Sequence, residues 1–224
     1  MTVQVFPAGH LGYPAGMARG EADQAIVHVV DDDAALRESL DSLFRSVGLT
    51  CRTYESARAF LEAGRDDAAG CIVTDVRLPG MSGLDFQARL GELGIHLPVI
   101  LMTGHGDIPM SVKAMKAGAI DFLTKPFRDQ DMLDAVGTAI ERDRQRRSAE
   151  ADASGVRRRF ETLTARERQV MLLVTAGKMN KQVAGELGLS EMTIKIHRGA
   201  AMRKMAARSF ADLIRMAALI KPES

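Results

Sequence analysis

The chain has 224 residues, of which 46% are hydrophobic and 26% charged, and its formal net charge is +1. Arg, Asp and Lys interrupt every apolar run, which excludes a membrane-spanning helix, and the length suits one large or two small domains. Residues 1–24 are rich in Gly, Pro and Ala and lack the basic start and long apolar run of a secretory signal. We therefore expect a flexible N-terminal tail, starting at Met1 or Met17, on a cytoplasmic protein.

The small net charge hides an asymmetry between the two ends of the chain. Residues 1–155 hold 16 basic and 23 acidic residues, a net charge of −7, whereas residues 156–224 hold 14 basic and 6 acidic residues, a net charge of +8. An acidic front and a basic back indicate two domains with different partners. The basic back is a candidate for binding nucleic acid.

Strands and helices alternate over the first two thirds of the chain. Short apolar runs predict five strands, at 26–30, 50–54, 71–74, 98–102 and 119–123. Apolar stripes and capping residues predict five helices, at 34–46, after Ser56, at 83–92, from Asp107 and Pro109 to Gly118, and at 129–147. Five β-α pairs predict an α/β fold with a parallel sheet covered on both faces. Only the flavodoxin-like order 2-1-3-4-5 places strands 1 and 3 side by side at a switch point.

The remainder of the chain predicts a small all-α domain. Thr164 and Glu167 have the spacing of a capping box, which marks the start of a helix. Three further polar residues are candidate N-caps: Asn180, Ser190 and Ser209. The turn Gly188-Leu189-Ser190 joins a short helix to a longer one at 191–206, which is typical of a helix-turn-helix.

These patterns also predict the domain boundaries. The tail covers residues 1–24 and the α/β domain residues 25–147. A polar segment of small residues at 148–160 is interpreted as a linker, and residues 161–224 form the helical domain.

Four predicted strand ends carry side chains that can do chemistry. Asp31 and Asp32 follow the first strand, Asp75 ends the third, and Thr103 and Lys125 follow the fourth and fifth. Because the carboxyl ends of parallel strands meet at one edge, we expect these groups to converge around Asp75. Oxygen ligands without His or Cys favour Mg²⁺, and a carboxylate beside Mg²⁺ can attack phosphorus to give an acyl phosphate. Lys125 and the Thr103 hydroxyl would then bind the phosphoryl oxygens.

Residues 25–147 resemble the receiver domain of two-component response regulators. The matching motifs are Val30-Asp31-Asp32-Asp33, Thr74-Asp75-Val76-Arg77-Leu78-Pro79-Gly80-Met81-Ser82-Gly83, Thr103-Gly104-His105-Gly106 and Lys125-Pro126-Phe127. The resemblance implies that Asp75 accepts a phosphoryl group from a sensor histidine kinase. It also implies a Mg²⁺ site made of Asp31, Asp32, Asp75 and the backbone carbonyl of Arg77, and a switch pair of Thr103 and Phe122. Asp33 is better interpreted as a helix N-cap than as a metal ligand, and His105 needs no catalytic role.

In a helix-turn-helix the second helix lies in the major groove of DNA. The candidates on 191–206 to face DNA are Thr193, Lys195, Ile196, His197, Arg198, Gly199, Arg203 and Lys204. Residues 163–219 resemble the LuxR-type domain of FixJ/NarL regulators, through Leu163-Thr164-Ala165-Arg166-Glu167, Asn180-Lys181, Thr193-Ile194-Lys195-Ile196-His197 and Met202-Arg203-Lys204-Met205. The resemblance implies base contacts near Lys195, Ile196 and Gly199, and phosphate contacts from Lys181, Thr193 and Arg203. Gly199 departs from the larger polar residue common at its position.

The sequence as a whole is interpreted as a response regulator rather than an enzyme. The expected partners are a sensor histidine kinase, double-stranded promoter DNA, a second copy of the chain after phosphorylation and, as a further candidate, RNA polymerase; no membrane is involved. Two alternatives stay open. One is an enzyme with an Asp nucleophile, such as a haloacid-dehalogenase-like phosphatase, although Arg77 stands where that class has its second Asp. The other is a receiver that signals without phosphorylation.

Overall fold

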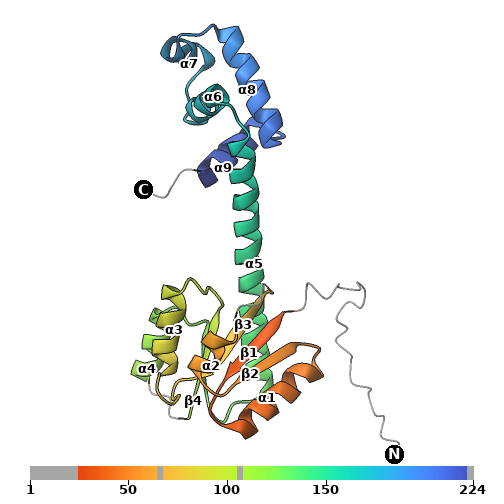
Figure 1. The fold of residues 1–224 in the computed structure, drawn as a ribbon, viewed down its shortest axis with the longest axis vertical. Coiled ribbons are helices and arrows are strands. Elements are labelled where there is room, and N and C mark those ends of the chain that lie inside the picture. Colours follow the sequence, from red (N-terminus) through yellow and green to blue (C-terminus); the bar gives the residue numbers. More distant parts are fainter. Residues whose placement is uncertain (1–24, 65–67, 105–107, 221–224) are drawn as a thin grey trace, which may run out of the picture. The chain divides into compact units, whose positions relative to one another are not determined.

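The computed structural model describes residues 25–64, 68–104 and 108–220 (Figure 1). The expectations for the tail at 1–24, for His105 and for Asp107 lie outside these residues. The chain divides into two compact units, Met1–Arg144 and Gln145–Ser224. Within the described ranges, no helix combines the length and the apolar character that crossing a bilayer requires.

The first unit alternates strands and helices along the chain. Its elements are β1 (Ile26–Val30), α1 (Ala34–Ser46), β2 (Thr50–Tyr54), α2 (Ala57–Glu62), β3 (Gly70–Asp75), α3 (Gly83–Glu92), β4 (Val99–Thr103), α4 (Ile108–Lys116), β5 (Asp121–Thr124) and the first part of α5 (Asp129–Glu161). The five strands form one parallel sheet in the order β2-β1-β3-β4-β5. The predicted fold class and strand order are therefore confirmed. The fifth strand begins two residues later than the predicted 119–123.

Two apolar layers hold the helices against this sheet. On one face, Leu40 and Phe44 of α1 and Met132 and Val136 of α5 pack against β-strand residues such as Val27. On the other face, helices α2, α3 and α4 contribute the side chains Ala57, Phe60, Phe86, Leu90 and Ala114. Because both faces are covered, the central strands are apolar without alternation, as parallel sheets require. The acidic side chains Asp31 and Asp75 stand at the ends of these strands.

The second unit is helical, as predicted. After the last part of α5 come α6 (Ala165–Thr175), α7 (Asn180–Leu187), α8 (Glu191–Met205) and α9 (Phe210–Ile220). One apolar cluster joins Val156 of α5 to Met171, Met205 and Leu213. A second cluster holds α6, α7 and α8 together through Val170, Val174, Val183, Ala184 and Ile194. The capping box of Thr164 and Glu167 is present.

The predicted end of the long helix at 147 is wrong, because α5 continues to Glu161 and the segment 148–160 is helical. This segment contains no Pro, and most of its residues are good helix formers, so Gly155 alone costs only about 1 kcal/mol. Arg146 also supports it by pairing with Glu150 one turn later, at 2.8 Å. The further assignment of 148–160 as an interdomain linker stays a prediction.

The predicted N-cap at Asn180 is also wrong. Met179 occupies the N-cap position, and Asn180 is the first residue of α7. The Met179 side chain offers no capping oxygen. Instead, the Gln182 side chain accepts a hydrogen bond from the Met179 backbone N–H at 2.8 Å, which satisfies one donor at this helix end.

Gly83 is the place where α3 meets the end of β3. A Cβ built on Gly83 would lie 2.3 Å from the Asp75 carbonyl oxygen and 3.0 Å from the Val76 Cα. We expect Gly83→Ala to lower the free energy of unfolding by about 1–3 kcal/mol, because the backbone must shift to admit the methyl group. Urea unfolding measures the change.

Gly91 on the same helix provides the matched control. A Cβ built there meets nothing within 4 Å, so Gly91→Ala should be neutral or raise the free energy of unfolding by up to about 1 kcal/mol. Equal stability of the two variants would show that the close approach at Gly83 is not tight in solution.

Candidate functional site

The acidic site lies where β1 and β3 end. These strands are neighbours, and Val30 pairs with Thr74, so the next residues, Asp31 and Asp75, reach the same edge of the sheet. Asp31 is 1% exposed and Asp75 is 9% exposed. Two carboxylates withdrawn from water need a positive partner, because an unpaired buried charge is costly.

Lys125 supplies that positive charge. Its Nζ donates to Oδ2 of Asp31 at 2.8 Å and also donates to Oδ2 of Asp75. In the sheet β5 is separated from β3 by β4, so only a long side chain can reach from the end of β5 to this pair. The Lys125 backbone N–H donates to the Thr103 carbonyl at 2.7 Å. The peptide bond to Pro126 is cis.

Opposing effects act on the pKa of Lys125. Burial lowers it by removing water from the ammonium group, whereas the hydrogen bonds and charges of Asp31 and Asp75 raise it, and the pKa ends above its usual value. Lys125 therefore stays a cation at neutral pH. One ammonium group faces two carboxylates, so the site can accept a further cation.

Each carboxylate uses its second oxygen in the same way. Oδ1 of Asp31 accepts from the Asp33 backbone N–H at 2.9 Å, and Oδ1 of Asp75 accepts from the Arg77 backbone N–H at 2.7 Å. These are Asx-turns, which bend the chain away from the strand direction. Both carboxylates are thereby held with one oxygen on the backbone and the other on Lys125.

The remaining acidic residues divide as follows. The Asp33 side chain caps α1 by accepting from Ala35 and Leu36, which confirms its interpretation as an N-cap. Asp32 is exposed, and no contact draws it toward Lys125 in the structure as described.

Arg37 was not identified from the sequence: its guanidinium donates to the Asp31 carbonyl at 2.6 Å. Its place on α1, six residues after Asp31, is the only signal that could have indicated this contact.

The donor set is compatible with Mg²⁺. Within residues 25–64, 68–104 and 108–220, no group of three or more His, Cys, Asp or Glu side chains is gathered as a metal site. Mg²⁺, however, is usually bound by only one or two carboxylates together with waters and phosphate oxygens. Asp31 and Asp75, whose oxygens converge on one point, meet that requirement.

Thr103 and Phe122 lie on the neighbouring strands β4 and β5. The register pairs Thr103 with Thr124 and Leu101 with Phe122, so Thr103 and Phe122 point to the same face of the sheet. Phe122 packs there against the cluster beneath α2, α3 and α4. Thr103 is fully buried and Phe122 half-buried. The sheet thus places the predicted pair close to one another, while their role as a switch stays a prediction.

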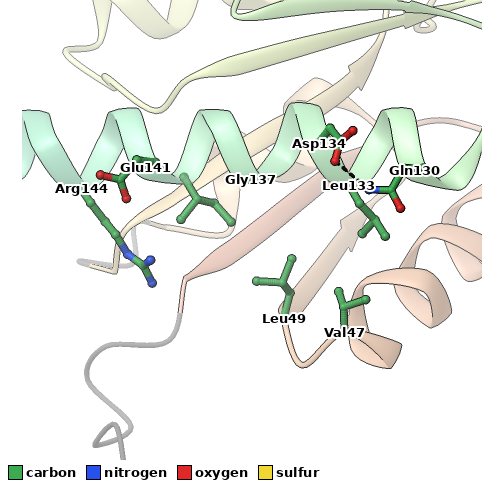
Figure 2. A pocket seen from close by; sticks show the side chains of 9 residues that line it. Val47, Leu49, Gln130, Leu133, Asp134, Gly137, Glu141 and Arg144 are labelled. Carbon is green, nitrogen blue, oxygen red and sulfur yellow. Dashed lines mark hydrogen bonds between the residues drawn. The ribbon is translucent and has the colours of Figure 1, made fainter. Parts of the chain in front are cut away.

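A hollow of about 740 Å³ lies on another part of the first unit, between the end of α1 and one side of α5 (Figure 2). Its lining is apolar in the middle and charged or polar around it: Val47, Leu49, Gln130, Leu133, Asp134, Gly137, Ile140, Glu141 and Arg144. None of these residues takes part in the site around Asp75.

The helix-turn-helix is built by α7 and α8. Gly188 ends α7 with φ 65° and ψ 35°, a left-handed conformation that favours glycine. Oγ of Ser190 caps α8 by accepting from the Thr193 backbone N–H at 3.1 Å, and the two hydroxyl groups are hydrogen-bonded to one another at 2.8 Å. The predicted second helix of the motif is therefore present, with its start fixed at Ser190.

The candidate DNA-binding residues differ in exposure. Lys181 on α7 and four residues on α8 are exposed: Lys195, Ile196, Arg203 and Lys204. Thr193, His197, Arg198 and Gly199 are half-buried. A Cβ built on Gly199 would lie 3.7 Å from an Arg203 guanidinium nitrogen. The Arg203 side chain therefore lies over Gly199, which has no side chain of its own.

Two of the basic residues expected to face DNA also make contacts within the domain. The Arg198 guanidinium stacks over the Phe210 ring, 5.7 Å from its centroid, and donates to Asn180 at 3.4 Å. Lys204 donates to the Glu167 carboxylate at 2.6 Å. Hydrogen bonds from Lys204 and from the Thr164 backbone hold the pKa of Glu167 below its usual value. Lys204 therefore ties α8 to the capped start of α6.

Comparison with known proteins agrees with both halves of the structure. Residues 27–137 match the response regulator receiver domain, and residues 161–217 match the luxR family of bacterial regulatory proteins. Nodulation protein W of Bradyrhizobium diazoefficiens is 60% identical over 86% of this chain and 85% of its own length. The transcriptional regulatory protein FixJ of Azorhizobium caulinodans is 48% identical over 86% and 92%, respectively. The solved structure of response regulator StyR has a TM-score of 0.76 and 45% identity, covering 87% of this chain and 98% of that one.

Proposed function

Since this chain belongs to the two-component response regulators that carry a receiver and a LuxR-type DNA-binding domain, we propose that Asp75 is its phosphoacceptor. One observation carries the proposal: the buried carboxylates of Asp31 and Asp75 share the Lys125 ammonium at the carboxyl end of the sheet. This arrangement combines a nucleophile, a candidate metal ligand and a fixed positive charge in one place.

The proposed reaction is a phosphoryl transfer from a sensor histidine kinase. The phosphorus–nitrogen bond of a kinase phosphohistidine breaks, and a carboxylate oxygen of Asp75 forms the new bond to phosphorus. Lys125, released from Asp75, then neutralises the phosphoryl group, and the Thr103 hydroxyl donates to one of its oxygens. The Asx-turn to Arg77 keeps the Asp75 carboxylate oriented throughout.

A Mg²⁺ ion would be held by Asp31, Asp32, Asp75 and the backbone carbonyl of Arg77. When bound, it neutralises charge on the phosphoryl oxygens. Asp31 is the best placed of the other ligands, because its carboxylate already meets that of Asp75 at Lys125. Asp32, which is exposed, would have to turn toward the ion.

The output we propose is binding of double-stranded promoter DNA by a phosphorylation-induced homodimer. Lys195, Ile196 and Gly199 on α8 would lie against base edges in the major groove, with His197 beside them. Lys181, Thr193 and Arg203 would contact phosphates. Exposure of Lys181, Lys195 and Arg203 supports these roles. RNA polymerase is the further partner expected of a transcription regulator.

A regulator is favoured over an enzyme with an Asp nucleophile. FixJ and StyR, two of the proteins named above, are regulators. The residue two positions after Asp75 is Arg77, whose side chain is exposed. No general acid is therefore provided at that position. The protein is proposed to accept and hold a phosphoryl group rather than to turn over a substrate.

Acetyl phosphate provides the direct test of the proposal. We expect the whole chain to gain one phosphoryl group in the presence of Mg²⁺ and none after the metal is removed with a chelator, because the phosphoryl charge is then not neutralised. Intact-mass spectrometry measures the gain, and adding Mg²⁺ back should restore it. An unlabelled chain under all conditions would favour a receiver that signals without phosphorylation.

A further inference from the structure

Three unusually exposed hydrophobic side chains lie on the helix-turn-helix. Met179, Met192 and Ile196 are 68%, 65% and 61% exposed, which makes them the most exposed large hydrophobic residues in the described part of the chain. Met179 precedes α7, whereas Met192 and Ile196 lie on α8. A lone exposed hydrophobic residue such as Met179 needs no binding role, whereas neighbouring exposed hydrophobic residues that form a patch mark an interaction site.

The geometry of α8 places Met192 and Ile196 on one face. Each residue of an α-helix turns by about 100°, and residues four apart are neighbours on the surface. The buried side of α8 carries Ile194, Ala201 and Met205. The side directly opposite carries four residues: Met192, Ile196, Gly199 and Arg203. Met192 and Ile196 therefore form a short apolar strip along the first turns of the outward face.

The surroundings of this strip indicate its ligand. Lys195 lies next to Ile196 and is exposed, and Arg203 follows on the same face two turns later. Two apolar side chains are too few for a stable protein interface, which buries a far larger surface. A strip that is apolar and flanked by positive charge suits a ligand that combines methyl groups with phosphates. The major groove is such a ligand, because each thymine presents a 5-methyl group there.

We propose that Met192 determines DNA sequence specificity by contacting a thymine 5-methyl group, one helical turn before the contact made by Ile196. The proposal rests on the proposed placing of α8 in the major groove. Four residues of helix span about 6 Å, and base pairs are about 3.4 Å apart. The two methyl groups are therefore expected about two base pairs apart. Gly199 ends the apolar strip, because the next position on this face has no side chain.

The test compares two forms of the same DNA. The whole chain, treated with acetyl phosphate, first selects duplexes from a randomised double-stranded library, which identifies the preferred sequence. Deoxyuridine then replaces thymidine at one position of that sequence at a time, which removes only the 5-methyl group. We expect wild-type affinity to fall about fourfold at two positions about two base pairs apart, as burial of one methyl-sized group implies.

Variants assign each methyl contact to a side chain. Met192→Ala should lose the effect of deoxyuridine at the first position and retain it at the second, and Ile196→Ala should do the reverse. Met192→Leu should retain part of the effect, because it keeps an apolar side chain. Met179→Ala removes a methionine of matching exposure outside α8, and it should leave both effects unchanged.

The outcomes separate this inference from the proposed function. If wild type selects a sequence but Met192→Ala shows the same deoxyuridine effects as wild type, Met192 does not read DNA. The inference about Met192 is then overturned, while the proposed DNA-binding function stands. Lower transcription by that variant with RNA polymerase would then assign Met192 to a protein contact. If the phosphorylated chain selects no sequence at all, the proposed DNA-binding role of α8 fails, and the inference fails with it.

Discussion

Asp75→Asn is expected to abolish phosphorylation by acetyl phosphate, with a loss of rate of at least about 10⁴-fold, the scale found when a nucleophile is removed. The amide has nearly the shape of the carboxylate, and its oxygen can still accept from the Arg77 backbone N–H. It has no negative charge with which to attack phosphorus or to hold Mg²⁺. Intact-mass spectrometry after incubation with acetyl phosphate and Mg²⁺ measures the result.

Asp121→Asn is the matched control for this variant. Asp121 begins β5 and so lies at the opposite edge of the sheet from Asp75. Its carboxylate accepts from the Phe122 backbone N–H, a contact that an amide oxygen can replace. The control should be labelled like the wild type. Labelling of Asp75→Asn at the wild-type rate would disprove the assignment of the phosphoacceptor.

Thr103→Ala is expected to separate phosphorylation from dimerisation. The variant keeps Asp31, Asp75 and Lys125, so it should still accept the phosphoryl group. It lacks the hydroxyl that would move toward the phosphate and vacate space for the Phe122 ring, on the same face of the sheet. Repacking of Phe122 would alter the surface of α4 and β5, where Val112 and Met115 are already exposed. We expect the phosphorylated variant to remain mostly monomeric.

The size of the effect follows from the population that phosphate must shift. Moving an equilibrium from 1:99 to 99:1 takes roughly 5.5 kcal/mol of preference for the active state. Loss of the Thr103 hydroxyl should therefore reduce the dimer from nearly all of the protein to a minor fraction. DNA with two half-sites about one helical turn apart should bind more weakly too, because dimerisation and paired binding are linked.

Two threonine variants control for loss of stability. Thr124 is the register partner of Thr103 but is exposed, so Thr124→Ala should dimerise like the wild type. Thr103→Ser keeps the hydroxyl and should restore dimerisation in large part. Light scattering on the phosphorylated proteins measures the dimer. Equal dimerisation of wild type and Thr103→Ala would show that Thr103 does not link phosphorylation to dimerisation.

The sequence by itself determined which elements form and which residues stand at the strand ends. Apolar runs bounded by turn residues identified the three central strands β1, β3 and β4, because a strand buried on both faces has few polar residues to obscure it. The capping box at Thr164 and the turn before Ser190 identified the helical domain from local hydrogen-bonding patterns alone. The pattern of strands places Asp31, Asp75, Thr103 and Lys125 at the strand ends.

Residues that stay helical without an apolar stripe were harder to predict. The segment 148–160 reads as a polar linker, yet α5 continues through it to Glu161. Helix propensity and pairs such as Arg146 with Glu150 maintain the helix there, and these signals are weak in a single sequence. Near its end, Val156 and Phe160 join the apolar cluster of the second unit, a contact that depends on where α6 and α9 fold.

The sequence predicted that the groups at the strand ends converge, whereas only the tertiary structure decided which hydrogen bonds they form. Lys125 lies 94 residues from Asp31 and 50 from Asp75, and the sheet order alone brings the three together. Likewise, Arg198 and Lys204 have the charge of DNA-binding residues, but the structure shows contacts within the domain: Arg198 stacks on Phe210, and Lys204 donates to Glu167. The sequence did not indicate that Met192 is exposed, because a methionine on a helix usually lies in the core. Its exposure follows from the direction in which Ile194, Ala201 and Met205 face the core, and that direction is fixed by packing rather than by local sequence.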